Sequence, residues 1–336
     1  MAEIDSASRG IVKDRNRLYW DQFKQMRSPC PLRAEQEAIV RFLDWANGRL
    51  ERAIRAKRKV IALLTEQKQA IIQRAVARGL DPGVALKASG VSWLGETPEH
   101  WDVRAIGAAS ALIQTGPFGS QLHSHEYVTG GTPVINPSHM AAGHLSPSSQ
   151  VTISSAKVAE LSRHMLKCGD VVIARRGELG RCALVGPSEE GWICGTGSLL
   201  LRCKLSDLRP AFFQLVFSSS GVSDMLSLSS IGATMANLNA SVVARLRIPL
   251  PPVREQDAIA EFVDAETRRF EKMAAHLADE IELLRQYRTR LVADVVTGKL
   301  DVRDAATRLP DAPLGGAADP SDAPHEIELA DEETAA

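Results

Sequence analysis

Basic and polar side chains gather on turns in the middle of the chain, where they could contact nucleic acid. Arg175 and Arg176 end a predicted strand and Arg181 follows shortly after, so we expect all three to contact DNA phosphates. Amide, imidazole and hydroxyl groups on nearby Gly-, Pro- and Ser-rich segments are of the types that read base edges. The candidates for base contact are Gln121, His123, Asn136, Ser138, Thr234 and Asn237.

The sequence lacks the motifs of a catalytic or cofactor-binding site. It contains no Gly-x-x-x-x-Gly-Lys-[Ser/Thr] loop and no Gly-x-Gly-x-x-Gly after a predicted strand, which argues against nucleotide binding by those routes. Residues 136–139 (NPSH) differ from the amino-methyltransferase motif at the third and fourth positions. His123 and His125 lack a third ligand at a suitable spacing, which favours a polar loop over a metal site. We therefore expect no catalytic residue, metal or cofactor in this chain.

The charge balance is an average over two unlike parts. The 336 residues include 40 Lys+Arg and 41 Asp+Glu, for a formal net charge of −1. From residue 310 onward the sequence holds eight acidic residues and no Lys or Arg, so without them residues 1–309 carry +7. The near-neutral total is therefore compatible with binding to DNA.

Cysteine usage and hydropathy indicate the compartment. The five Cys are an odd number and form no Cys-x-x-Cys pair, which is typical of free thiols in a reducing environment. The first residues lack the apolar run of a signal peptide, and no stretch approaches 18 consecutive apolar residues. We expect a soluble, cytoplasmic protein that has no membrane partner.

An internal repeat with a constant offset of 220 residues organises the chain. Residues 35–44 (EQEAIVRFLD) are identical to residues 255–264 (EQDAIAEFVD) at six of ten positions. Each copy begins with prolines and continues as an apolar stripe at spacings of three and four, which predicts long helices over 31–81 and 251–300. A stripe of about six heptads predicts that these helices pair in a coiled coil, with each other or with a second chain.

Residues 91–250 have a different pattern. Short apolar runs between Gly, Pro and Ser turns predict strands over 151–153, 170–174, 182–185 and 198–202, and a helix over 209–226. The expected fold class is therefore α+β, with a globular α/β domain inserted between two long helices that form a coiled coil.

Several long motifs follow one another in the order found in a known family. They are residues 93–101 (WLGETPEHW), 116–120 (GPFGS), 169–177 (GDVVIARRG), 234–239 (TMANLN), 248–256 (IPLPPVREQ) and 296–300 (VTGKL). From Leu18 to Asp301 the chain resembles the DNA-specificity subunits of type I restriction-modification systems.

The resemblance implies a division of labour among subunits. Residues 91–250 would be a target recognition domain that reads one half of a bipartite site in double-stranded DNA. The antiparallel coiled coil would set the spacing between half-sites and dock methyltransferase (M) subunits. Chemistry would belong to those and to a motor-nuclease (R) subunit, which would hold S-adenosylmethionine, ATP and Mg²⁺, so the specificity subunit itself would be non-catalytic.

The chain departs from the family pattern because it holds a single recognition domain, a half-size form. Residues 18–31 match the end of such a domain at the same offset, so we expect residues 1–30 to be the remnant of a missing first domain. We expect residues 301–336 to be a disordered acidic tail. Three alternatives stay open: a homodimer reading an inverted site, pairing with another specificity chain, or a truncated or regulatory DNA-binding coiled-coil protein without a methyltransferase partner.

Overall fold

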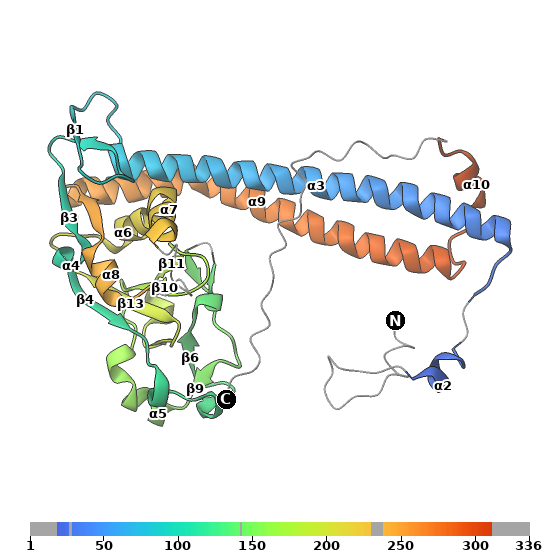
Figure 1. The fold of residues 1–336 in the computed structure, drawn as a ribbon, viewed down its shortest axis with the longest axis horizontal. Helices are drawn as coiled ribbons and strands as arrows, with labels where there is room; N and C mark the ends of the chain where they lie inside the picture. The colour runs from blue at the N-terminus through green and yellow to red at the C-terminus, as the bar shows by residue number, and fades with distance from the viewer. Residues whose placement is uncertain (1–18, 27–28, 142, 230–237, 311–336) are drawn as a thin grey trace. The chain divides into compact units, whose positions relative to one another are not determined.

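The computed structural model describes residues 19–26, 29–141, 143–229 and 238–310 (Figure 1). The chain divides into two compact units, one of Met1–Ile61 with Ala275–Ala336 and one of Ala62–Ala274. Helices α3 (Arg33–Arg78) and α9 (Val253–Val296) each contribute to both units. A mixed domain, residues 79–252, is inserted between them and is called the inserted domain below. This architecture confirms the predicted fold class.

In the first unit α3 and α9 pair antiparallel. Lys57 Nζ lies 2.7 Å from Glu280 Oε2, and Glu51 pairs with Arg288, so positions on α9 fall as positions on α3 rise. The apolar stripes meet between the helices in a buried cluster that includes Ala46, Leu291, Val295 and Val302. The helix pair therefore has the two features of a coiled coil: an apolar seam between the helices and ion pairs that flank it.

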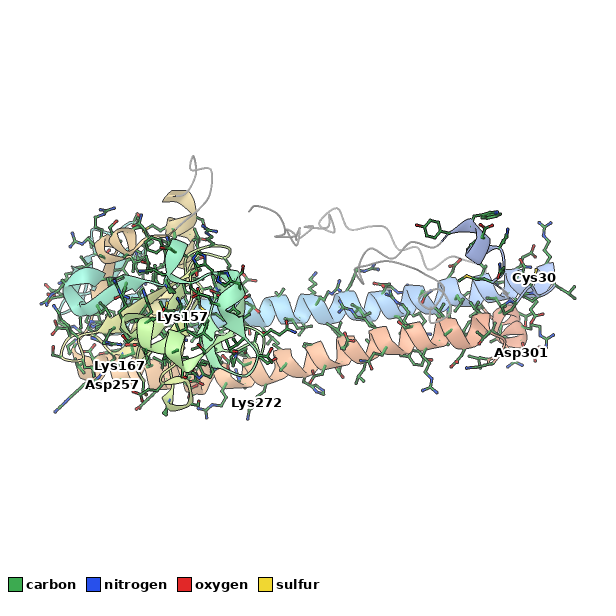
Figure 2. All side chains as sticks on the ribbon, turned by 90° about the horizontal axis from the view of Figure 1, so that it is seen from below. Cys30, Lys157, Lys167, Asp257, Lys272 and Asp301 are labelled. Atoms are coloured by element: carbon green, nitrogen blue, oxygen red, sulfur yellow. The ribbon has the colours of Figure 1, made fainter. Side chains whose placement is uncertain are left out.

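The end of the helix pair corrects the expected tail. Residues 301–310 begin the segment predicted to be disordered, yet they contain helix α10 (Arg303–Thr307), and Val302 and Ala306 are each 3% exposed. The short helix α2 (Trp20–Phe23) belongs to the same unit, and Cys30 and Asp301 flank one end of the helix pair (Figure 2). The prediction missed α10 because two apolar residues four apart give a very short periodic signal.

The inserted domain is built from short strands, and the strands predicted around 152, 172, 183 and 200 are confirmed. Its strands are β1 (Leu86–Ala88), β2 (Glu96–Pro98), β3 (Asp102–Ala105), β4 (Ser110–Thr115), β5 (Tyr127–Val128), β6 (Thr132–Ile135), β7 (Met140–Ala141), β8 (His144–Leu145), β9 (Thr152–Ile153), β10 (Val171–Ala174), β11 (Cys182–Leu184), β12 (Ile193–Cys194), β13 (Ser198–Cys203) and β14 (Arg247–Leu250). Its α-helices are α4 (Ile106–Ala109), α5 (Ser155–Glu160), α6 (Pro210–Phe217), α7 (Ser220–Ser229) and α8 (Ala240–Arg245). The 3₁₀ turns in its described part are η2 (Gly119–Gln121), η3 (Ser124–Glu126), η4 (Pro137–His139), η5 (Ser162–His164) and η6 (Pro187–Glu189).

Two four-stranded sheets form the centre of this domain. The first has the order β11-β10-β13-β4 and is antiparallel throughout. The second has the order β12-β6-β9-β5, with β12 parallel to β6. The main core unites Phe212, Phe213 and Phe217 of α6 with Trp101 and with Ile72 near the end of α3. The helix predicted over 209–226 is broken at residues 218–219, because α6 and α7 pack as separate helices.

Two side chains at the start of α9 fix the inserted domain. Glu255 accepts hydrogen bonds from Trp101 Nε1 at 2.8 Å and pairs with His100 Nε2 at 2.8 Å. Gln256 is fully buried: its Oε1 accepts from the Arg209 backbone N–H at 2.7 Å, and its Nε2 donates to the carbonyl oxygens of residues 207 and 251. Every polar atom of Gln256 is thus satisfied, so its burial costs little.

Among the described residues no helix is both long and apolar enough to cross a lipid bilayer.

Candidate nucleic-acid interface

The predicted arginine cluster lies on the turn that joins β10 to β11. β10 is fully buried as the second strand of its sheet, and the chain emerges from the sheet at Arg175. Gly177 has a φ of 77°, a left-handed conformation that favours glycine. The turn therefore brings Arg175, Arg176 and Arg181 to one end of the sheet.

Arg175 is half-buried, and its side chain is held by contacts with backbone carbonyls. Its Nε donates to Leu238 O at 2.9 Å and its Nη1 to Thr196 O at 3.4 Å. Its backbone N–H donates to Gly197 O, and its carbonyl accepts from the Leu238 N–H. Burial, followed by the nearby charge of Arg176, lowers the pKa of the Arg175 guanidinium. Arg175 therefore joins three segments, and a structural role is better supported than the expected phosphate contact.

Arg176 and Arg181 differ from Arg175 in their contacts. Arg176 is exposed, and within the described part of the chain no hydrogen bond or ion pair engages its side chain. Arg181 is half-buried, and its Nε has no hydrogen-bond partner among the described residues. The exposed guanidinium of Arg176 therefore keeps its donors available for an anion, as a phosphate contact requires, whereas the unpartnered Nε of Arg181 is itself buried.

Three loops meet at the segment formed by residues 195–197. The Gly195 N–H donates to Ile135 O at 2.8 Å, and the Gly116 N–H donates to Ser198 O at 2.9 Å. A Cβ on Gly116 would lie 1.8 Å from Gly195 O, so only glycine permits this approach. The loops that start at residues 116, 136 and 175 therefore converge on one segment of the inserted domain.

The base-contact candidates on these loops differ in their exposure and in the contacts that their side chains already make. Ser138 and His123 are exposed, and the His123 ring stacks on His125 with centroids 5.4 Å apart. Gln121 is exposed, with its Oε1 accepting from the Phe118 N–H at 3.3 Å. Asn136 is half-buried and hydrogen-bonds Tyr127, whose pKa burial raises.

Two of the candidates, Thr234 and Asn237, lie outside the described residues. The exposed Thr196 was missed by the sequence prediction, although it occupies the centre of the convergent segment. Its signal was the Gly-Thr-Gly turn between two short apolar runs.

A partly buried ion pair lies at the start of β10, at the opposite end of this strand from the arginine turn. Asp170, which is 1% exposed, precedes β10 and receives Arg202 Nε and Nη2 at 2.7 Å each. Asp170 Oδ2 also accepts from the Lys167 N–H at 2.7 Å. Because both carboxylate oxygens are bonded, the pair fixes the start of β10 against β13.

The buried thiols of the domain are poor nucleophiles. Burial raises the pKa of Cys182 and of Cys194 to about 12, so both thiols are protonated at neutral pH. Within the described segments no group of three or more His, Cys, Asp or Glu is placed to hold a metal ion.

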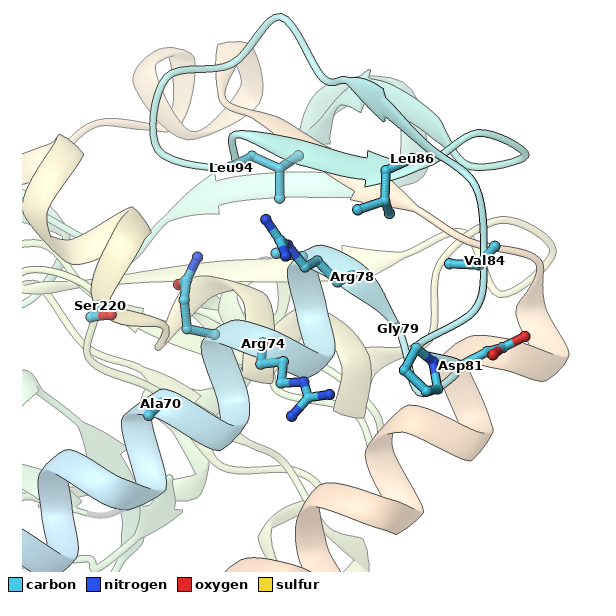
Figure 3. A pocket seen from close by; sticks show the side chains of 12 residues that line it. Ala70, Arg74, Arg78, Gly79, Asp81, Val84, Leu86, Leu94 and Ser220 are labelled. Carbon is cyan, nitrogen blue, oxygen red and sulfur yellow. The ribbon is translucent and has the colours of Figure 1, made fainter.

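A cavity of about 600 Å³ opens at the end of α3 (Figure 3). It lies between Arg74 and Arg78 of α3, the β1–β2 hairpin and Ser220 at the start of α7. Arg78 pairs with Glu96 across 3.3 Å. None of the described residues predicted from the sequence to contact DNA lines this cavity, so it is separate from the convergent loops.

Known proteins resemble this chain over most of its length. The family model for the type I restriction modification DNA specificity domain matches residues 98–283, more than half of the chain. The EcoKI specificity subunit of Escherichia coli K12 is 25% identical over 286 residues, covering 83% of this chain and 57% of that protein. The MjaVIII specificity subunit of Methanocaldococcus jannaschii is 22% identical over 293 residues, covering 84% and 64%.

A solved structure shares the fold. A chain from a study of complex assembly and conformational transition in a type I restriction-modification system aligns with a TM-score of 0.55 and 18% identity. The alignment covers 81% of this chain and 61% of that one. This chain thus spans between half and two thirds of the length of these relatives.

Proposed function

The chain belongs to the type I restriction-modification DNA specificity family, and from this premise we propose that it is a non-catalytic cytoplasmic subunit that reads one DNA half-site. The observation that carries the proposal is the convergence of the loops from residues 116, 136 and 175 on residues 195–197. Arg176 and Arg181 supply phosphate contacts, and Ser138, His123 and Thr196 supply exposed polar groups for base edges.

The work of each loop follows from its contacts. Phosphate contacts orient the domain on the duplex, because they are independent of sequence. Base contacts then discriminate, each contributing about 1–3 kcal/mol against a wrong base. The Arg175 contacts with Leu238 O and Thr196 O hold the loops together, and the ion pair of Asp170 with Arg202 holds β10 against β13, so less ordering remains to be done on binding.

Selection of bound sequences from randomised duplexes tests this function. The purified protein, alone and with its methyltransferase, should enrich a short defined half-site. Arg176→Ala should weaken binding to all sequences alike, whereas Ser138→Ala or Thr196→Ala should relax the preference at one position. Enrichment of no motif, or an identical motif in every variant, would contradict the proposal.

Docking of partners is a second part of the proposal. Gln36 Nε2 donates to Pro31 O at 2.8 Å, the same contact that Gln256 makes with Pro251 at the repeat-equivalent position. Gln256 also binds the inserted domain, whereas Gln36 is exposed and its side chain makes this local bond alone among the described residues. We infer that the start of α3 receives a second recognition domain, through self-association or pairing with another specificity chain.

The remaining partners follow the family. Methyltransferase subunits dock on the coiled coil, and the motor-nuclease subunit joins that complex; S-adenosylmethionine, ATP and Mg²⁺ belong to those subunits. Co-purification of the tagged protein with a methyltransferase tests this part. Recovery without any methyltransferase, with DNA binding intact, would favour the alternative of a truncated or regulatory DNA-binding coiled-coil protein.

A further inference from the structure

The first unit carries an exposed basic stripe on α3. The stripe consists of Arg52, Arg55, Arg58 and Lys59, four cations within eight positions. None of the four has an ion-pair partner among the described residues, unlike Lys57, which pairs with Glu280. Cations this close repel one another, so a negatively charged group placed beside them is stabilised.

The chain leaves helix α10 beside the same face of α3. Arg41 Nη2 donates to Leu309 O at 2.8 Å, Val302 belongs to the helix-pair cluster, and Ala306 is buried. Arg41, Arg52 and Lys59 are separated by 11 and 7 residues, which is about three and two helical turns. The Arg41 contact therefore delivers the chain to the face that carries the stripe.

The segment that follows has the opposite charge. Residues 311–333 contain eight Asp or Glu and no Lys or Arg. From Arg41 to Lys59 is about 27 Å along a helix, whereas twenty-three residues can span up to about 80 Å. The acidic residues can therefore reach every cation of the stripe within one molecule, and tethering raises their effective concentration there.

We propose that the basic stripe on α3 is an anion-binding face whose occupant is the chain's own acidic segment, residues 311–333. In this contact the segment keeps other polyanions away from the stripe. The inference stands independently of the proposed DNA-reading function, because the stripe lies in the first unit and the convergent loops lie in the second.

A double-mutant cycle with a polyanion tests the proposal. Affinity for a labelled heparin oligosaccharide is measured by fluorescence anisotropy at 50 mM salt for the full chain and for a chain ending at Pro310. Removal of the segment should raise affinity about three- to tenfold, and the gain should vanish at high salt. In a background with Arg52→Ala, Arg55→Ala, Arg58→Ala and Lys59→Ala, the truncation should change affinity less than twofold.

A matched variant separates a specific contact from net charge. Arg74, Arg245, Arg254 and Lys272 are also exposed, and all four lie in the second unit. Their replacement by Ala removes the same charge and should leave the effect of truncation intact. An equal effect of truncation in all three backgrounds, or none in the unsubstituted chain, would overturn the proposal.

A second measurement reads the contact directly. Zero-length carbodiimide cross-linking joins an amine to a carboxylate that it touches, and Lys59 is the one amine of the stripe. Mass spectrometry of the full chain should find Lys59 joined to carboxylates within residues 311–333, with loss of the product at high salt. Cross-links from these carboxylates to Lys272 but not to Lys59 would contradict the assignment.

Discussion

Alanine substitution of the two adjacent arginines on the β10–β11 turn should affect different properties: Arg175→Ala should reduce stability, and Arg176→Ala should reduce DNA affinity. The Arg175 guanidinium donates hydrogen bonds to Leu238 O and Thr196 O, whereas Arg176 is exposed without such contacts among the described residues. A hydrogen bond from a charged donor contributes about 1.5–3 kcal/mol, and the 3.4 Å contact adds little. Arg175→Ala should therefore lower the free energy of unfolding by about 1.5–3 kcal/mol, and Arg176→Ala by less than about 0.5 kcal/mol.

The effect on DNA affinity should come from the loss of Arg176, because Arg176 is the exposed arginine that is free to contact a phosphate. Loss of one phosphate contact lowers the salt slope by about 0.9, so the affinity deficit of Arg176→Ala should shrink three- to fourfold between about 50 and 200 mM salt. Urea unfolding gives the stabilities, and anisotropy titration of a duplex across salt concentrations gives the slopes. Arg254→Ala, which removes an equal charge from an exposed position, is the control.

Two results would contradict these roles of Arg175 and Arg176. One is an unchanged free energy of unfolding in Arg175→Ala; the other is an unchanged salt slope in Arg176→Ala together with a lowered slope in Arg254→Ala.

Three further predictions concern buried polar groups. Asp170→Asn should lower the free energy of unfolding by about 2–3 kcal/mol, since Arg202 is left with a neutral partner. Thermal unfolding measures this loss of stability, and an unchanged melting midpoint would contradict the prediction. Burial lowers the pKa of His164 from its usual value of 6.5, so the unfolded state binds a proton more readily, and stability should fall as pH drops from 7 to 5. In urea unfolding, the free energy of unfolding of His164→Gln should depend less strongly on pH. Gln256→Ala should cost about 2–3 kcal/mol, whereas its repeat counterpart, Gln36→Ala, should cost less than about 0.5 kcal/mol in the same assay.

The elements that could be predicted were those with a strong local signal. Long apolar stripes predicted α3 and α9, and buried runs such as Val171–Ala174 predicted strands, because periodicity survives without knowledge of neighbours. The break between α6 and α7 was missed although residues 218–221 (SSSG) give a local turn signal, because the apolar residues on either side were read as one continuous helix.

The site was predictable by residue type but not by role. Arg175 and Arg176 are identical in the sequence, and only the distant Thr196 and Leu238 carbonyls distinguish the clamp from the exposed cation. The importance of residues 195–197 depends on three loops that are far apart along the chain. Such convergence is a property of the folded sheet, so local pattern could not reveal it.

Comparison of DNA methylation in cells with the gene present and deleted tests the central claim most directly. The account predicts that one defined methylated motif disappears on deletion and returns on complementation, and that a homodimer requires this motif to be an interrupted palindrome. An unchanged methylome, in cells that express the protein together with its methyltransferase, would contradict the assignment of this chain as the subunit that reads DNA.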